Sequence, residues 1–273
     1  MTNKYIDKLK QVFDLPFVKA LKQQGAGVYI VGGAVRDALR KKDPKDIDLI
    51  ISRVPYAQLI SFLKQYGDVK TVGEAFGVIL FKTEGFEGEI ALPRVDSKDK
   101  SLKGHKSIVA QSDPYIPISK DLARRDFTIN AIALTFNEQG EAEFIDPFNG
   151  ISDLKVREIR YVDSEAFADD PLRLLRAIQF GARFYFSITQ RTLDAIANNA
   201  HLIKEITPER ILMEFQKVID KKGNIDSFFG FLDSTQVFKN IFGFKMNFKR
   251  SLRFVKDITT VGELLFVCCL GQN

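Results

Sequence analysis

The chain has 273 residues, of which 45% are hydrophobic and 27% are charged, and its formal net charge is +5. This length predicts two structural units, and the small positive excess fits a polyanionic partner without establishing one. Because the only cysteines, Cys268 and Cys269, are adjacent and only two histidines occur, a zinc cluster, a disulfide framework and a Ser/His/Asp hydrolase triad are excluded. No apolar run approaches the roughly 20 residues of a membrane helix, so we expect a cytoplasmic protein with no membrane partner.

The first half of the chain alternates strand and helix patterns. A short buried strand at 28–31 ends at a diglycine and is followed by a helix at 34–41 and a second strand at 46–52. A helix at 56–66 and strands at 77–82 and 86–92 complete a mixed sheet with packed helices. Residues 95–120 are polar and lack periodicity, which predicts a flexible loop.

The second half is predicted to be helical throughout, with helices at 170–184, 190–200 and 208–220. Thr207 can cap the third of these helices, and Pro208 occupies its first position. The sequence therefore predicts an α+β (mixed α/β) domain over residues 1–163 and an all-helical domain over residues 164–273. The apolar segment 264–270 has no helix after it to pack against, so we expect the natural chain to continue.

The strongest chemical signal is the pair Asp46 and Asp48, two residues apart on a predicted strand, where both carboxylates point to one face. Two carboxylates so placed repel each other unless cations lie between them. Magnesium is commonly held by one or two carboxylates together with substrate phosphates, and a pair of such ions supports phosphoryl transfer. The alternative is the polar face of an exposed strand.

The diglycine Gly32-Gly33 ends the first strand and opens a helix, where backbone N–H groups can bind an anion. Arg36 can add bidentate phosphate contacts. Taken alone, the two glycines indicate only a tight turn. Together with the acid pair that follows, they indicate a triphosphate beside bound metal.

Three further groups have both a chemical and a structural interpretation. Glu89 lies opposite the buried face of its predicted strand, where it can add a third carboxylate or simply face solvent. Arg125 lies in a segment with two arginines and an acid, Arg124 to Ala131, in which Asp126 is expected to cap an apolar helix and leave the arginines for phosphates or sugar. The alternative there is a capped surface helix.

Asp170, Arg173 and Arg176 share one helix face at three-residue spacing. They can form surface ion pairs, or a carboxylate and a guanidinium can match the base edges of C and A and leave mispaired groups against G and U. In the second interpretation, protein side chains replace a nucleic-acid template.

In this order the motifs resemble the class II tRNA nucleotidyltransferase and bacterial poly(A) polymerase family of the polymerase-beta-like superfamily. The resemblance covers roughly residues 25–220 and rests on residues 32–48, 73–77, 124–131, 146–150, 153–154, 169–180 and 208–211. It implies a catalytic head (1–163) and a helical neck with a partial body (164–273) that reads the nucleotide base and binds RNA. The implied activity is stepwise addition of C, C and A to the 3′ end of tRNA from CTP and ATP, with release of pyrophosphate.

The resemblance also implies roles for single residues. Asp46 and Asp48 match the family's Mg²⁺ ligands, and Gly33 and Arg36 match its triphosphate contacts. The residues that match nucleotide-binding positions are Arg125, Asp170, Arg173 and Arg176. Two residues depart from the family pattern, because Asp169 stands where glutamate is usual and Gln179 stands where arginine is usual.

Two alternatives share these motifs. One is the same chemistry with another product, by a poly(A) polymerase or an enzyme adding only CC or only A. The other, from a different class, is a noncatalytic RNA-binding protein of the same fold. A basic stretch that either could use for RNA phosphates, or that could be a solvated helix face, contains Lys245, Lys249, Arg250, Arg253 and Lys256.

Overall fold

The computed structural model describes residues 3–72, 77–98, 108–163, 167, 169–245 and 258–270. Two compact units are present, one extending to residue 154 and one beginning at residue 155. The predicted functional domains, 1–163 and 164–273, stay a prediction.

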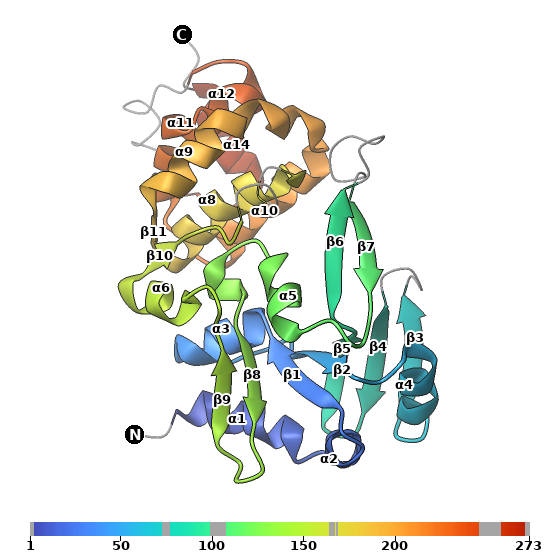
Figure 1. The fold of residues 1–273 in the computed structure, drawn as a ribbon. Helices are drawn as coiled ribbons and strands as arrows, with labels where there is room; N and C mark the ends of the chain where they lie inside the picture. Colours follow the sequence, from blue (N-terminus) through green and yellow to red (C-terminus); the bar gives the residue numbers. More distant parts are fainter. Residues whose placement is uncertain are drawn as a thin grey trace. The chain divides into compact units, whose positions relative to one another are not determined.

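The first unit is built on a seven-stranded sheet (Figure 1). Its strand order is β3-β4-β5-β2-β1-β8-β9. Neighbouring strands are antiparallel except for β2 and β5, which are parallel. The strand bounds are β1 (Gly27–Val31), β2 (Asp48–Ser52), β3 (Asp68–Val72), β4 (Val78–Thr83), β5 (Phe86–Ala91), β8 (Ala133–Phe136) and β9 (Ala142–Ile145).

One face of this sheet forms the core of the unit. Apolar residues at alternate positions, such as Ile30, Leu49 and Phe81, are almost fully buried there. Phe17 packs edge-on against Phe81, with ring centroids 5.1 Å apart. The helices of this unit are α1 (Lys4–Phe13), α2 (Pro16–Gln23), α3 (Gly33–Leu39), α4 (Tyr56–Leu63), α5 (Ile118–Ala123) and α6 (Gly150–Val156).

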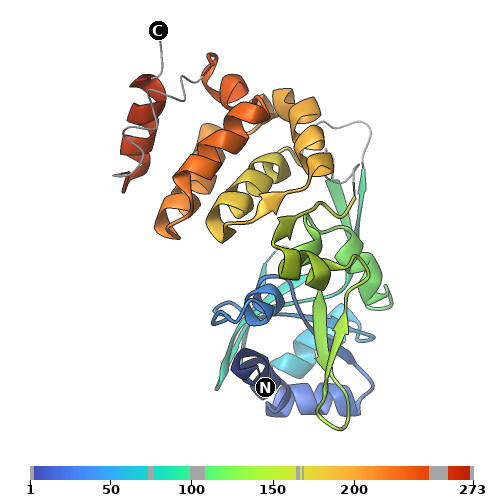
Figure 2. The same ribbon diagram turned by 90° about the vertical axis from the view of Figure 1, so that its left-hand side faces the viewer.

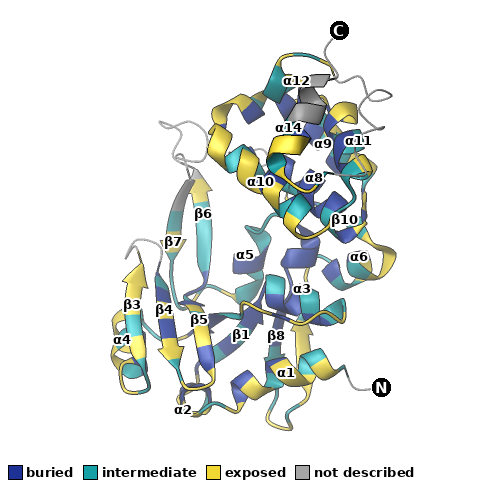
Figure 3. Ribbon diagram, turned by 180° about the vertical axis from the view of Figure 1, so that it is seen from behind, coloured by how far each residue is buried: buried dark blue, intermediate teal, exposed yellow. Residues whose placement is uncertain are grey.

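The same alternation places a different set of residues on the opposite face. Asp48 and Ile50 of β2 lie there, as do Glu89 and Ala91 of β5, because they are out of step with the buried Leu49 and Ile90. Figure 3 shows the contrast between the buried centre of the sheet and its exposed edge strand β3. The period of two thus sends apolar residues to the core and carboxylates to the other face.

The flexible loop predicted for residues 95–120 is wrong for the described part of that segment. Strands β6 (Arg94–Lys98) and β7 (Ile108–Ser112) pair along their whole length in an antiparallel ribbon, and α5 follows. Neither strand has an apolar alternation, since β6 contains three charged residues and β7 begins with three apolar residues in a row, but pairing satisfies their backbone groups. Residues 99–107 lie outside the described part of the chain.

The helix expected after Asp126 is also wrong. The structure has a short 3-10 helix, Thr128–Asn130, and then strand β8. Ala133 and Leu134 are fully buried and pair with β1 on one side and β9 on the other. A short apolar run that is buried on both faces cannot be distinguished from a buried helix by periodicity alone.

The second unit confirms the predicted helical character (Figure 2). Helix α8 packs against α10 and α11. Phe215 of α10 and Phe228 of α11 are fully buried and meet edge-on, with ring centroids 5.0 Å apart. The helices are α8 (Leu172–Phe184), α9 (Gln190–Asn199), η4 (Ala200–Glu205), α10 (Pro208–Asp220), α11 (Ile225–Ser234), α12 (Val237–Phe242) and α14 (Val261–Leu270); β10 (Glu158–Ile159) and β11 (Ser187–Ile188) form a short parallel pair.

None of the helices that the structure describes is both long enough and apolar enough to cross a membrane.

Candidate active site

The register of the sheet brings Asp48 next to the diglycine turn. In the antiparallel pair of β1 and β2, Val31 lies opposite Asp48, and Val31 directly precedes Gly32. Gly32 has φ 68° and ψ −125°, a backbone conformation that side chains disfavour, and α3 begins at the next residue. The acid and the turn therefore meet at one end of the central strands.

Glu89 joins Asp48 at this end through the parallel pairing of β2 and β5. Leu49 lies opposite Ile90, which puts the two acids side by side, and the charge of Glu89 raises the pKa of Asp48. Phe86 and Ile90 are buried on the other face, as the strand pattern predicted. The structure thus brings together two of the three predicted catalytic carboxylates.

Asp46 lies in a bend two residues before the first residue of β2 and is exposed, so the predicted strand start at residue 46 is wrong. The geometric argument that both acids share one face of a strand therefore does not apply to it directly. Asp46 still lies close enough to Asp48 to raise the pKa of that carboxyl. The two carboxylates are neighbours through the bend instead of through strand alternation.

The electrostatics of Asp48 fit a bound cation. Burial raises the pKa of Asp48, the negative charges of Glu89 and Asp46 raise it further, and Arg125 acts in the opposite direction. In the part of the chain that the structure describes, no group of three His, Cys, Asp or Glu side chains is arranged to hold a metal ion. A divalent ion beside Asp48 would therefore take further oxygen ligands from a substrate or from water, as magnesium commonly does.

A cavity of about 170 Å³ lies against these carboxylates. Asp48 and Glu89 contribute negative charge to its lining, and Arg94, Arg124 and Arg125 contribute positive charge. Apolar residues of the sheet, including Ile50, complete the lining. The cavity thus combines the charges needed by a ligand that carries both phosphates and a metal ion.

Arg125 faces the diglycine turn. Its Nε and Nη2 donate to Asp121 Oδ2 at 3.4 and 3.1 Å. A Cβ atom placed on Gly32 would lie 2.8 Å from Arg125 Nη1, so the glycine leaves room for this guanidinium. Burial lowers the pKa of Arg125, and the charge of Asp121 opposes that shift.

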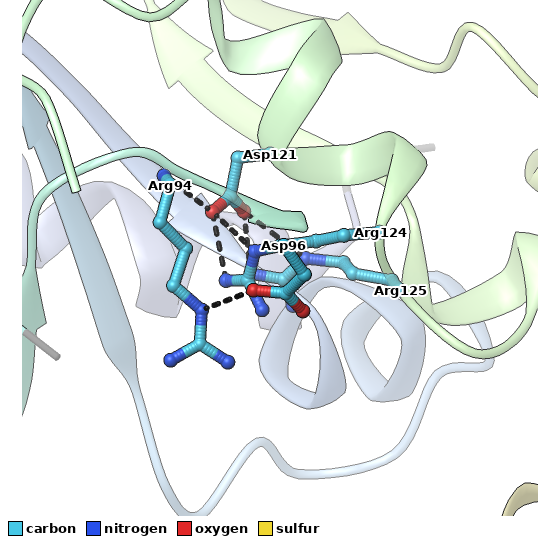
Figure 4. Close-up of polar contacts among 5 residues, drawn as sticks. All are labelled: Arg94, Asp96, Asp121, Arg124 and Arg125. Carbon is cyan, nitrogen blue, oxygen red and sulfur yellow. Dashed lines mark hydrogen bonds and ion pairs between the residues drawn. The ribbon is translucent and has the colours of Figure 1, made fainter. Parts of the chain in front are cut away.

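Asp121 joins the arginines that line the cavity (Figure 4). Its side chain is fully buried, and its Oδ1 accepts hydrogen bonds from Arg124 Nη2 at 2.7 Å and from the backbone N–H of Arg94 at 3.2 Å. The Arg94 Nε atom lies 3.4 Å from Asp96 Oδ1. Neither Arg94 nor Asp121 is among the predicted site residues, although Asp121 stands three and four residues before the two arginines.

Arg36 is not among the residues that line the cavity, but its Nη2 atom lies beside the diglycine turn, 3.6 Å from where a Cβ on Gly33 would stand. Its buried guanidinium donates to both Asp37 oxygens, at 2.9 and 3.0 Å, and to Asn130 Oδ1 at 2.7 Å. These bonds fix the start of α3 to the segment that carries Arg125. The proposed triphosphate contact of Arg36 stays a prediction.

The predicted base-reading residues lie in the second unit at the start of α8. Asp170 Oδ1 accepts a hydrogen bond at 3.2 Å from the backbone N–H of Leu172, the first residue of α8, whose N-cap is Pro171. Arg173 is half-buried, and the Arg176 guanidinium lies 5.1 Å from the centre of the Phe180 ring. Their roles in binding a base stay predictions.

Two predicted motifs lie partly outside the described residues. Residues 73–76 of the segment 73–77 are among them. So are Lys249, Arg250, Arg253 and Lys256 of the basic stretch.

The mixed sheet, the acids beside the glycine turn and the following helical unit have the architecture of the class of proteins with a polymerase-beta-like head. Comparisons with known proteins agree. Residues 28–160 match the family described as "Poly A polymerase head domain", and residues 185–244 match "Probable RNA and SrmB- binding site of polymerase A". The chain belongs to the family of class II CCA-adding enzymes and poly(A) polymerases that share this head.

Individual relatives show how much of the chain the likeness covers. The chain is 36% identical over 207 residues to the CCA-adding enzyme of Anoxybacillus flavithermus, which covers 75% of this chain and 49% of that protein. The crystal structure of the Bacillus stearothermophilus CCA-adding enzyme in complex with CTP aligns with a TM-score of 0.68 and 29% identity, covering 84% of this chain and 53% of the other. The Thermotoga maritima CCA-adding enzyme complexed with tRNA aligns with a TM-score of 0.72 and 25% identity, covering 94% and 58%. The chain therefore spans about half the length of the relatives that it matches.

Proposed function

We propose that this protein is a template-independent RNA nucleotidyltransferase that adds C, C and A to the 3′ end of tRNA from CTP and ATP. The observation that carries the proposal is the position of Asp48 and Glu89 beside the Gly32 turn, facing the Arg125 guanidinium across one cavity. In this arrangement, a site for a metal ion lies next to a site for a polyphosphate. The names of its relatives, CCA-adding enzymes among them, favour tRNA as the acceptor.

The residues around the cavity would divide the work of phosphoryl transfer. Asp46 and Asp48 would hold Mg²⁺, and Glu89 would add a third carboxylate next to them. Magnesium bound there supplies the positive charge that activates the 3′ hydroxyl and stabilises the departing pyrophosphate. Arg125 would bind the incoming nucleotide, and the absence of side chains at Gly32 and Gly33 lets phosphate oxygens approach the backbone.

Selection of the nucleotide would rest on the start of α8. A carboxylate from Asp170 and a guanidinium from Arg173 complement the amino group and ring nitrogen that C and A share. G and U present the reverse pattern and would leave buried groups unpaired, which costs about 1–3 kcal/mol per group. Arg176 would hold the nucleotide from the same helix face.

The tRNA would be bound through its phosphates and shape, so its affinity would fall with salt. The second unit would contribute to this binding, because residues 185–244 match a region described as a probable RNA-binding site. Since this substrate belongs to the translation machinery, the proposal includes the cytoplasmic location expected from the sequence.

The decisive experiment supplies tRNA transcripts that end before the first C, after CC or after CCA, each with a single labelled nucleotide and Mg²⁺. The proposal predicts addition of two C residues to the first transcript, one A to the second and nothing to the third. Asp48→Asn, which keeps the side-chain shape and removes the charge, is the matched inactive control. A Tm close to that of the wild type would show that this variant is folded.

Other product patterns separate the alternatives. Long A tracts on many RNAs would identify a poly(A) polymerase, an outcome that the matched "Poly A polymerase head domain" makes worth testing directly. Addition of C only or of A only would identify a partial activity. Binding of tRNA with no incorporation of any nucleotide would show a noncatalytic RNA-binding protein and reject the proposal.

A further inference from the structure

Asp121 is a buried acid that contacts no proposed ligand yet joins two segments beside the cavity, the start of β6 and the arginine pair that follows α5. Its side chain has no solvent exposure. One oxygen accepts from Arg124 and from the backbone of Arg94, and the other accepts from Nε and Nη2 of Arg125. Every acceptor position of this carboxylate therefore faces a donor (Figure 4).

Arg125 lies between two competing sets of negative charge. Asp121 holds it on one side, while Asp48 and Glu89 line the same cavity on the other. Among the described residues, the ion pair of Arg125 is with Asp121, and the Arg125–Asp48 interaction acts only at longer range. Without Asp121, the acidic groups left to attract this guanidinium would be the adjacent Asp126 and the cavity carboxylate Asp48.

The hydrogen bonds also fix which part of Arg125 is presented. Because Nε and Nη2 are used by Asp121, the remaining amino group, Nη1, is the one that faces the Gly32 turn. Because the guanidinium is planar, turning it to improve one of these two hydrogen bonds to Asp121 would break the other. The direction of Nη1 is therefore set by Asp121.

We infer that Asp121 is a positioning residue of the nucleotide site: it aims Arg125 Nη1 at the diglycine turn and keeps this arginine off Asp48 and Glu89. The inference rests on the proposed nucleotidyl transfer and adds a residue to it. Its action is indirect, since Asp121 is buried behind the arginines that it holds.

The test is Asp121→Asn, which preserves size but places an amide donor against a guanidinium. We expect the Kd for CTP, measured by calorimetry on the full chain, to rise about tenfold to a hundredfold, the equivalent of a lost hydrogen bond to a charged group. The Mg²⁺ concentration for half-maximal incorporation should rise as well, because Arg125 then competes for Asp48. Asp153→Asn is the matched control, since Asp153 is buried, bonds to Thr128 and does not line the cavity.

A double-mutant cycle separates positioning from loss of structure. In an Arg125→Gln background, adding Asp121→Asn should change the CTP Kd by no more than about twofold, because Asp121 then has no Arg125 left to position. A twofold change is about the scatter expected of such a cycle. An equal loss in both backgrounds, or an equal effect of Asp153→Asn, would overturn the inference. If the wild-type chain binds CTP but incorporates nothing, the proposed function fails. The CTP Kd values of the wild type and the variants still test the role of Asp121 in that case.

Discussion

Replacing Asp48 by asparagine should make the protein more stable and abolish its activity. Burial and the neighbouring charges of Glu89 and Asp46 raise the pKa of Asp48, so its ionised form is a cost to the folded state in the absence of a cation. Substitutions that relieve such strain at functional sites commonly contribute about 0.5–2 kcal/mol. For a chain of this size that corresponds to a rise in Tm of roughly 1–8 °C.

The effect on catalysis should be much larger and of opposite sign. A metal ion contributes several kcal/mol to the transition state, and a loss of about 4 kcal/mol at 1.36 kcal/mol per factor of ten lowers the rate on the order of 10³-fold. Differential scanning calorimetry without Mg²⁺ and incorporation of labelled CTP with Mg²⁺ measure the two effects on one preparation. A lower Tm would refute the electrostatic argument, and near-normal incorporation would refute the metal role.

Because the pKa of Asp48 is raised above its ordinary value of 3.8, the folded state binds the proton more tightly, so stability should fall as pH rises from that value through the raised one. Urea titrations without Mg²⁺ should show this slope in the wild type and a smaller one in Asp48→Asn; equal slopes would contradict the assignment. Gly32→Ala should lose about 1–3 kcal/mol of stability through backbone strain and should weaken CTP binding by displacing Arg125, whereas unchanged calorimetric binding would count against the turn as a ligand site. Asp170→Ala or Arg173→Ala should reduce the preference for C and A over G and U by about tenfold or more, and single-nucleotide incorporation assays that show unaltered preference would remove the base-reading proposal.

The sequence predicted the centre of the sheet because its strands obey a simple physical pattern. Leu49, Ile50 and Ile51 form a short buried apolar run that follows Asp48, and an apolar run of this length, rich in β-branched residues and beside a glycine turn, favours a central strand. The edge strand β3 lacks such a pattern, since most of its residues are exposed. Its existence depends on pairing with β4, which a local pattern does not record.

The arginine cluster illustrates a second kind of limit. Arg125 is among the predicted binding residues, but its buried partner Asp121, which directly follows the segment interpreted as a flexible loop, was given no role. Its importance appears only when β6 and α5 are seen to meet, because Asp121 on the helix accepts a hydrogen bond from the backbone of Arg94 on the strand. Contacts between elements distant in sequence cannot be read from spacing alone.

Arg36 shows that the type of residue does not fix its partner. An arginine after two glycines suggests a phosphate contact, which stays a prediction, and in the fold Arg36 also donates hydrogen bonds to Asp37 and Asn130. Asp37 is the next residue in the sequence, whereas Asn130 is 94 residues away and is brought to Arg36 by the short helix that precedes β8.

The central claim is that the acids before and within β2 share a divalent ion with a nucleotide held at the glycine turn. Crystals of the protein grown with CTP and Mn²⁺ test it directly, because manganese scatters anomalously and substitutes for magnesium at oxygen sites. The account predicts an anomalous peak within coordination distance of both Asp46 and Asp48, with the triphosphate against Gly32 and Gly33. A triphosphate bound elsewhere, or a metal peak without either carboxylate, would contradict it.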